Sequence, residues 1–312
     1  MISFSKNHFP IIRSAGDKKQ LFNPVLKKRF KIRPEERVRL KWVEFLLLQT
    51  DWPKSRIGFE APVKLPQEEN ALRADLILYN KAMKPNILIE CKAESVKLNS
   101  TVAEQTARYN QAIGASYICL TNGVSDFWYR VENGSVKAIE SHDNPDFPLE
   151  ITTPLQELNR DITYWEHRGF CAGRFAGDPK NILQQSITHF WSEEIDWPVN
   201  YLDFPGLFLD FRLNQYYRVP VVDRDQKLAI SFMGTESGSS HLTAILNDKG
   251  RNRGILSVNL GKLSDQQADS AELLMNGNHR TLDAAQHLPL FKHGFSPKVI
   301  EQLPHYLMRF FV

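Results

Sequence analysis

Apolar residues along the first half of the chain gather in short runs separated by polar turns. Two of these runs, at 73–79 and 87–92, flank a polar segment, and the pattern predicts two strands of a hairpin. Side chains alternate between the two faces of a strand, so Glu90 and Lys92 project to the same face of the second strand. If the strands pair, Asp75 of the first strand lies near both.

Two helices are expected in the same half. Pro34 and the two acidic residues that follow it predict a helix over 34–49, because proline suits the first turn and acids favour the N-terminus. A capping box with Thr101 as N-cap and Glu104 predicts a second helix that ends at Gly114. Further strands are expected at 57–64, 117–120, 127–131 and 136–139.

The remaining segments complete an expected two-domain organisation. Residues 1–30 show little periodicity and are expected to form an arm or an edge strand. We therefore expect an α/β domain with a basic N-terminal arm over 1–150, and a helical linker with a β-rich α+β module of unknown role over 151–312. In that module, strands are expected at 216–222, 228–233, 241–246 and 255–260, followed by a last helix that begins at Ser296 and is interrupted near Pro304.

Composition narrows the class of protein. The 312 residues are 42% hydrophobic and 24% charged, as in a folded globular protein. No signal peptide and no apolar run of membrane-spanning length is evident, so we expect a cytoplasmic protein. The three cysteines are odd in number and widely spaced, which argues against a disulfide framework and a zinc knuckle.

The net charge of +3 is unevenly distributed. Residues 1–150 hold 23 Lys and Arg against 18 Asp and Glu, which is +5, and the remainder holds 16 against 18, which is −2. Much of the surplus comes from one cluster, formed by Lys18, Lys19, Lys27, Lys28, Arg29, Lys31, Arg33, Arg37, Arg39 and Lys41. Clustered cations gain affinity for polyanions by releasing counterions, so a nucleic-acid partner explains the surplus; a solvated helix face explains the cluster equally well. The cations assigned to nucleic-acid contact are Lys27, Lys28, Arg29, Arg37, Arg73 and Arg108.

The charged residues of the hairpin carry the candidate chemistry. An isolated Glu-x-Lys usually marks an exposed strand face. Here Ile87, Ile89 and Cys91 on one face and Leu88 on the other predict a strand that is buried on both sides. A buried carboxylate requires a partner or a metal, and two converging carboxylates suit Mg²⁺ or Mn²⁺.

The order of motifs resembles a known family. Residues from about Pro34 to Val131 resemble the PD-(D/E)xK nucleases, specifically the N-terminal nuclease domain of type I restriction enzyme R subunits. The usual Pro-Asp of the family is Ala74-Asp75 here. The resemblance implies a restriction-endonuclease-like mixed sheet flanked by helices. It rests on the segments 35–39 (EERVR), Glu60, 73–75 (RAD), 89–92 (IECK), 105–110 (QTARYN) and 120–123 (LTNG).

The resemblance also implies roles for individual residues. Asp75 and Glu90 would be ligands of Mg²⁺ or Mn²⁺, with the backbone carbonyl of Cys91 as a third donor. Lys92 would orient or activate the attacking water, and Gln105 would position that water or the scissile phosphate. Possible accessory residues are Glu36, Glu60 and Tyr109.

The implied function is a metal-dependent endonuclease that hydrolyses phosphodiester bonds, with DNA as the favoured substrate, in restriction or phage defence. No Walker A motif occurs, so no ATP motor is expected in this chain. The alternative is a non-cleaving nucleic-acid-binding or assembly module that retains the nuclease fold. The module over 151–312 would bind nucleic acid, form a homodimer, recruit a partner protein or sense an activating ligand.

Overall fold

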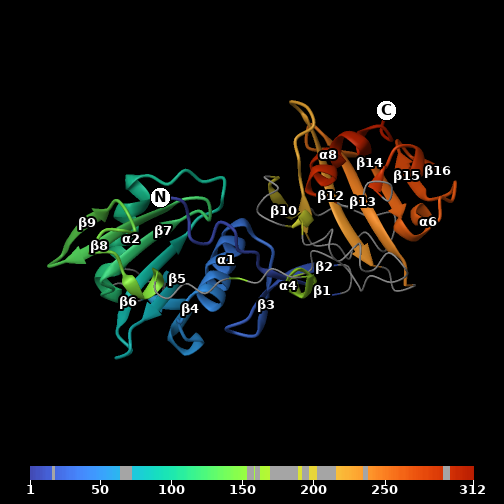
Figure 1. Ribbon diagram of the computed structural model, residues 1–312. Coiled ribbons are helices and arrows are strands. Elements are labelled where there is room, and N and C mark those ends of the chain that lie inside the picture. The colour runs from blue at the N-terminus through green and yellow to red at the C-terminus, as the bar shows by residue number, and fades with distance from the viewer. Residues whose placement is uncertain are drawn as a thin grey trace. The chain divides into compact units, whose positions relative to one another are not determined.

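The computed structural model describes residues 1–15, 18–63, 72–152, 158, 162–168, 189–191, 197–201, 216–234, 238–290 and 296–312. The chain divides into two compact units, Met1–Leu158 and Asn159–Val312 (Figure 1). The fold class expected from the sequence is confirmed: the first unit is α/β with a mixed sheet flanked by helices, and the second holds a separate antiparallel sheet.

A six-stranded sheet forms the centre of the first unit. Its strands follow the chain order, and every neighbouring pair is antiparallel except β6 and β7, which are parallel. A parallel pair needs a crossover connection, and the helix α2 supplies it. The strands are β4 (Ile57–Val63), β5 (Leu72–Tyr79), β6 (Pro85–Cys91), β7 (Tyr117–Thr121), β8 (Asp126–Glu132) and β9 (Ser135–Ile139).

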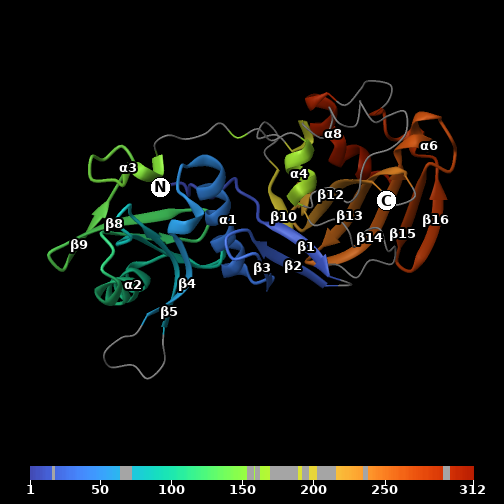
Figure 2. The same ribbon diagram turned by 90° about the horizontal axis from the view of Figure 1, so that it is seen from below.

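Two helices cover the opposite faces of this sheet (Figure 2). Helix α1 (Pro34–Gln49) places Trp42 against Trp128 of β8, with ring centroids 6.1 Å apart. Helix α2 (Ser100–Ile113) packs its last residue in a cluster with Leu88 of β6. By strand alternation, Glu90 projects to the same face as Leu88, which is the face that α2 covers. A 3-10 turn η1 (Lys54–Arg56) and a short helix α3 (Leu149–Thr152) complete this part of the unit.

The expected N-cap of α2 was wrong by two residues. Asn99, not Thr101, is the cap, and its side chain accepts a hydrogen bond from the backbone N–H of Val102 at 3.2 Å. Asparagine caps a helix at least as well as threonine, so the earlier residue begins the helix. The end was predicted correctly, because Gly114 follows α2 with φ of 75°, in the left-handed region that favours glycine.

The N-terminal segment, expected to be an arm or an edge strand, forms a small sheet. Strands β1 (Ile11–Ala15), β2 (Lys18–Asn23) and β3 (Lys28–Lys31) pair antiparallel in that order. The side chains of Ile11, Ile12 and Leu21 are buried, and β2 contacts α1. The strands are short and rich in cations, so the sequence showed no clear alternation there.

The second unit holds a seven-stranded antiparallel sheet in chain order, as expected for a β-rich module. The last helix runs through Pro304 without the expected interruption, because the buried Ile300, Leu303 and Leu307 anchor it on both sides of the proline. The elements are α4 (Ile162–Arg168), β10 (Val199–Tyr201), β11 (Tyr216–Arg218), β12 (Gln226–Gly234), β13 (Ser240–Asp248), β14 (Arg251–Asn259), α6 (Leu260–Ser264), β15 (Ala271–Met275), β16 (Asn278–Leu282), η3 (Ala284–Gln286) and α8 (Pro297–Met308).

Within the part of the chain that the structure describes, no helix combines the length and the apolar character that crossing a membrane requires.

Candidate functional site

Three acidic residues form a row across three neighbouring strands. The β5–β6 pairing ends at Leu76 opposite Ile89, and continuing its register places Asp75 opposite Glu90. The β4–β5 pairing omits Glu60, which continues the register opposite Asp75 on the other side. Glu60 has φ of 49°, so the backbone leaves the regular strand conformation at this point. Asp75 therefore lies between two other carboxylates, where both ladders are interrupted.

Both oxygens of Asp75 accept hydrogen bonds. Oδ2 accepts from the backbone N–H of Cys91 at 2.8 Å, and Oδ1 accepts from Nη2 of Arg39 at 2.5 Å. Burial raises the pKa of Asp75 above its ordinary value, against the opposing effect of the Arg39 guanidinium. Each carboxylate oxygen has a second lone pair, so these bonds leave acceptor capacity on both oxygens.

Glu90 and Lys92 form an ion pair, with Nζ of Lys92 2.7 Å from Oε1 of Glu90. Glu90 is buried, with 9% of the residue exposed. Burial first, and then the neighbouring Asp75, raise the pKa of Glu90 despite the lysine. For Lys92 burial acts to lower the pKa, but Glu90 and Asp75 outweigh it and the pKa is raised. The Asp75 carboxylate thus adds to the effect of burial in disfavouring the ionised form of Glu90, and a cation bound beside both would favour that form.

Arg39 of α1 connects the accessory carboxylates to this row. Its Nη1 lies 2.9 Å from Oε2 of Glu36 and 3.3 Å from Oε1 of Glu60, in addition to the contact with Asp75. Sequence reasoning placed Arg39 in a surface cluster of cations and missed this central position. The sequence did offer one signal of a less exposed position: Arg39 lies between the apolar Val38 and Leu40. Both of these neighbours are fully buried in the structure.

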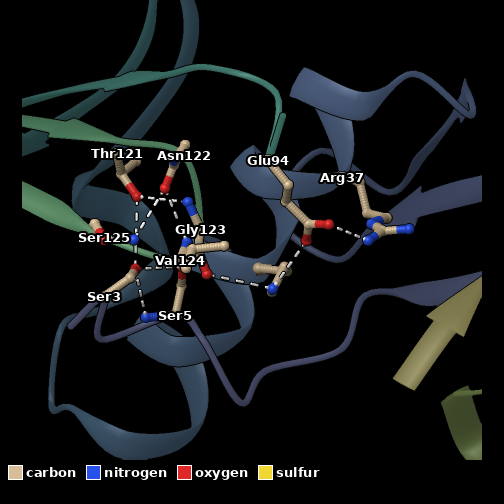
Figure 3. Close-up of polar contacts among 10 residues, drawn as sticks. Ser3, Ser5, Arg37, Glu94, Thr121, Asn122, Gly123, Val124 and Ser125 are labelled. Atoms are coloured by element: carbon tan, nitrogen blue, oxygen red, sulfur yellow. Dashed lines mark hydrogen bonds and ion pairs between the residues drawn. The ribbon is translucent and has the colours of Figure 1, made fainter. Parts of the chain in front are cut away.

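A second ion-pair network anchors the segment that carries Lys92. The Lys92 backbone N–H donates to the carbonyl of Thr121 at 2.8 Å. Two residues on, the Glu94 carboxylate contacts Arg37 at 2.5 Å and Lys41 at 3.2 Å, both on α1 (Figure 3). The Lys41 ammonium also reaches the carbonyl of Gly123. The segment after β6 is therefore attached both to α1 and to the turn after β7.

This network changes the assignment of Arg37. The sequence assigned it to nucleic-acid contact, but its guanidinium pairs with Glu94 and its side chain is only 18% exposed. Other assigned cations are exposed. Lys27 is the last residue of the turn between β2 and β3, and Lys28 and Arg29 begin β3. Arg73 is exposed on β5 and Arg108 is exposed on α2.

Gln105 and Tyr109 lie one turn apart on α2. The Gln105 side-chain amide donates to the Tyr109 hydroxyl at 2.6 Å. Gln105 is exposed and Tyr109 half-buried. Among the described hydrogen bonds, this pair is separate from the row of carboxylates, so the structure joins Gln105 to Tyr109 and not to Lys92.

The donor chemistry of the row suits a hard divalent cation, because carboxylate oxygens are the preferred ligands of Mg²⁺. Among the residues that the structure describes, no group of three or more His, Cys, Asp and Glu side chains is arranged as a metal site. A metal would therefore rest on two side chains, Asp75 and Glu90, with a backbone oxygen as third donor. The Cys91 thiol is not a candidate ligand, because it is fully buried and burial raises its pKa well above the ordinary value.

Comparison with known proteins gives one finding. The chain matches no curated protein. Residues 34–145, which include α1, the six-stranded sheet and α2, match a family model described as the type I restriction enzyme R protein N terminus. This part of the first unit therefore resembles the N-terminal domain of type I restriction enzyme R proteins.

Proposed function

We propose that the first unit is a divalent-metal-dependent nuclease that hydrolyses phosphodiester bonds, with DNA as its substrate. The observation that carries the proposal is the placement of Asp75 opposite Glu90, with Lys92 paired to Glu90, inside a domain that matches a restriction-enzyme family. Two carboxylates and one lysine at adjacent strand ends supply metal ligands and a group for proton transfer, which metal-assisted hydrolysis of a phosphodiester uses.

Asp75 and Glu90 would hold Mg²⁺ or Mn²⁺ through their free lone pairs, with the Cys91 carbonyl as third protein donor. A bound divalent ion supplies charge neutralisation at the phosphate and lowers the pKa of water. The Cys91 N–H and Arg39 fix the orientation of Asp75. Lys92 would orient or activate the attacking water, from a backbone position set by its bond to Thr121.

The family match supports a proposal for the wider role. We infer a part in restriction or phage defence and a cytoplasmic location, where DNA is accessible and Cys91 and Cys119 remain as free thiols. The exposed cations at the β2–β3 turn would contact the phosphate backbone. Gln105 would turn from Tyr109 toward the scissile phosphate when DNA is bound. The second unit would serve a homodimer or a partner protein.

A second candidate function has one observation in its favour. Both oxygens of Asp75 are already hydrogen-bonded, to Arg39 and to Cys91, and Glu90 is paired with Lys92. A site whose carboxylates already have hydrogen-bond and ion-pair partners would also fit a module that binds nucleic acid without cleaving it.

The decisive experiment incubates the purified chain with linear, circular and single-stranded DNA and with RNA, in Mg²⁺, Mn²⁺ or EDTA. We expect cleavage of DNA that requires the metal and is abolished in Glu90→Gln. Binding without cleavage in every metal would support the second candidate. Cleavage that persists in Glu90→Gln would show that the activity arises elsewhere.

A further inference from the structure

Arg39 is the only described cation that contacts three carboxylates of the site. Its guanidinium reaches Asp75, Glu36 and Glu60 from one side, and its side chain is 11% exposed. The guanidinium also lies over the Phe59 ring, with its central carbon 5.1 Å from the ring centroid. Phe59 and the carboxylates therefore hold this charge in one position rather than leaving it free to move into solvent.

The charges of the row and its neighbours support a specific number of metal ions. Four carboxylates, Glu36, Glu60, Asp75 and Glu90, carry four negative charges when ionised. Arg39 and Lys92 carry two positive charges, which leaves two negative charges. One divalent cation neutralises the remainder, whereas two would leave the buried cluster positive. Arg73 lies 3.8 Å from Glu60 but is 69% exposed, so water screens its charge.

Many metal-dependent nucleases use two ions about 3.5–4 Å apart, both bridged by a shared carboxylate. The shared carboxylate here would be Asp75, which lies between Glu90 and Glu60 in the row. On the Glu60 side, the place beside Asp75 is taken by Arg39. Glu36, whose other oxygen Oε1 is buried without a hydrogen bond among the described residues, completes the acidic lining of that side.

We propose that Arg39 takes the place of a second metal ion, so that the site binds a single divalent cation, between Asp75 and Glu90. This inference rests on the proposed nuclease function and deepens it. Arg39 is then a positioning residue: it holds Asp75 ready for the one metal and keeps Glu36 and Glu60 from binding another. A lysine in its place would keep the charge but lose the planar fork that bridges several carboxylates at once.

The test is the stoichiometry of Mn²⁺ binding to the full chain, measured from the decrease of the free Mn²⁺ signal in electron paramagnetic resonance. We expect one Mn²⁺ per wild-type chain and two per chain of Arg39→Ala. Arg56→Ala is the matched control, because Arg56 contacts the Tyr79 carbonyl and the Trp52 ring instead of carboxylates; it should bind one. Circular dichroism with and without Mn²⁺ establishes that each variant is folded.

The outcomes separate this inference from the proposed function. Two Mn²⁺ per wild-type chain would overturn the role of Arg39 even if DNA is cleaved, and this measurement needs no variant. One Mn²⁺ in both wild type and folded Arg39→Ala would overturn it as well. Wild-type protein that binds no Mn²⁺ would overturn both the inference and the metal-dependent nuclease.

Discussion

The Asp75 carboxylate accepts a hydrogen bond from the backbone N–H of Cys91 at 2.8 Å, across the point where the β5–β6 ladder ends. Cys91 separates Glu90 from Lys92, so this bond ties Asp75 directly to the segment that carries the other two site residues. The bond thus fixes the Asp75 carboxylate relative to the backbone of that segment.

Substitutions at Lys92 and at Asp75 should distinguish the loss of catalysis from the loss of metal binding. We expect Lys92→Ala to lower the rate of DNA cleavage by about 10²-fold or more, because a group that transfers a proton is removed. Binding of Mn²⁺ should be retained, since Asp75 and Glu90 remain. Asp75→Asn should abolish both cleavage and Mn²⁺ binding. Initial rates of DNA cleavage and Mn²⁺ titrations distinguish the two variants. If Lys92→Ala lost as much Mn²⁺ binding as Asp75→Asn, the assigned roles would be contradicted.

The buried carboxyl of Asp126 should make stability depend on pH. The residue is fully buried, its Oδ2 accepts from the Phe4 N–H, and burial raises its pKa to about 6 from 3.8. A carboxyl with a raised pKa in the folded state stabilises the fold below its unfolded pKa. That contribution disappears as the pH rises through about 6.

We therefore expect Asp126→Asn to be more stable than wild type at pH 8, by roughly 3 kcal/mol at most, with the advantage gone at pH 4. Urea unfolding at both pH values measures this difference. Asp143→Asn is the control, because the Asp143 side chain is 85% exposed. A difference between Asp126→Asn and wild type that does not change with pH would be inconsistent with a buried titrating carboxyl.

Two glycines with the same backbone conformation should differ in their tolerance of alanine. Gly123 and Gly114 have φ of 76° and 75°, so each alanine costs about 1–2 kcal/mol in backbone strain. A Cβ at Gly123 would also lie 3.3 Å from Val38, whereas at Gly114 it meets nothing within 4 Å. Gly123→Ala should therefore be the less stable variant in urea unfolding, by about 1 kcal/mol or more. Equal destabilisation of the two variants would contradict this prediction, because it would mean that Val38 of α1 moves away from the added methyl group.

The exposed cations at the β2–β3 turn should contribute to DNA affinity through salt-dependent binding. Replacing Lys27, Lys28 and Arg29 by Gln should weaken binding and reduce the slope of log affinity against log salt by about 0.9 for each phosphate that is no longer neutralised. Fluorescence anisotropy between about 50 and 200 mM salt, the range where such effects are large, measures both.

The matched control for the turn replaces three other lysines of the same unit, Lys54, Lys81 and Lys84, which are also exposed. We expect this control to keep the salt slope of the wild type. An unchanged slope in the turn variant, or an equal change in the control, would exclude a specific role for the turn.

The sequence alone determined the hairpin that carries Asp75 and Glu90 and the two helices, because these depend on local periodicity and turn residues. The mixed sheet was implied by the family resemblance. The sequence also determined that Gln105 and Tyr109, four residues apart on one helix, share a face, whereas the hydrogen bond between them is seen only in the structure. It misplaced the cap of α2 because Asn99 and Thr101 both suit that position, and only the first turn of the helix distinguishes them.

Only the tertiary structure decided what the cations do. Arg37, Arg39 and Lys41 look alike in sequence, as alternate charges on one helix, and all suggested contact with phosphate. In the fold, Arg39 meets the carboxylates of β4 and β5, whereas Arg37 and Lys41 meet Glu94 beyond β6. These partners lie 21 to 57 residues away along the chain. Charge pairing across such separations depends on how the helix packs against the sheet, which local sequence does not encode.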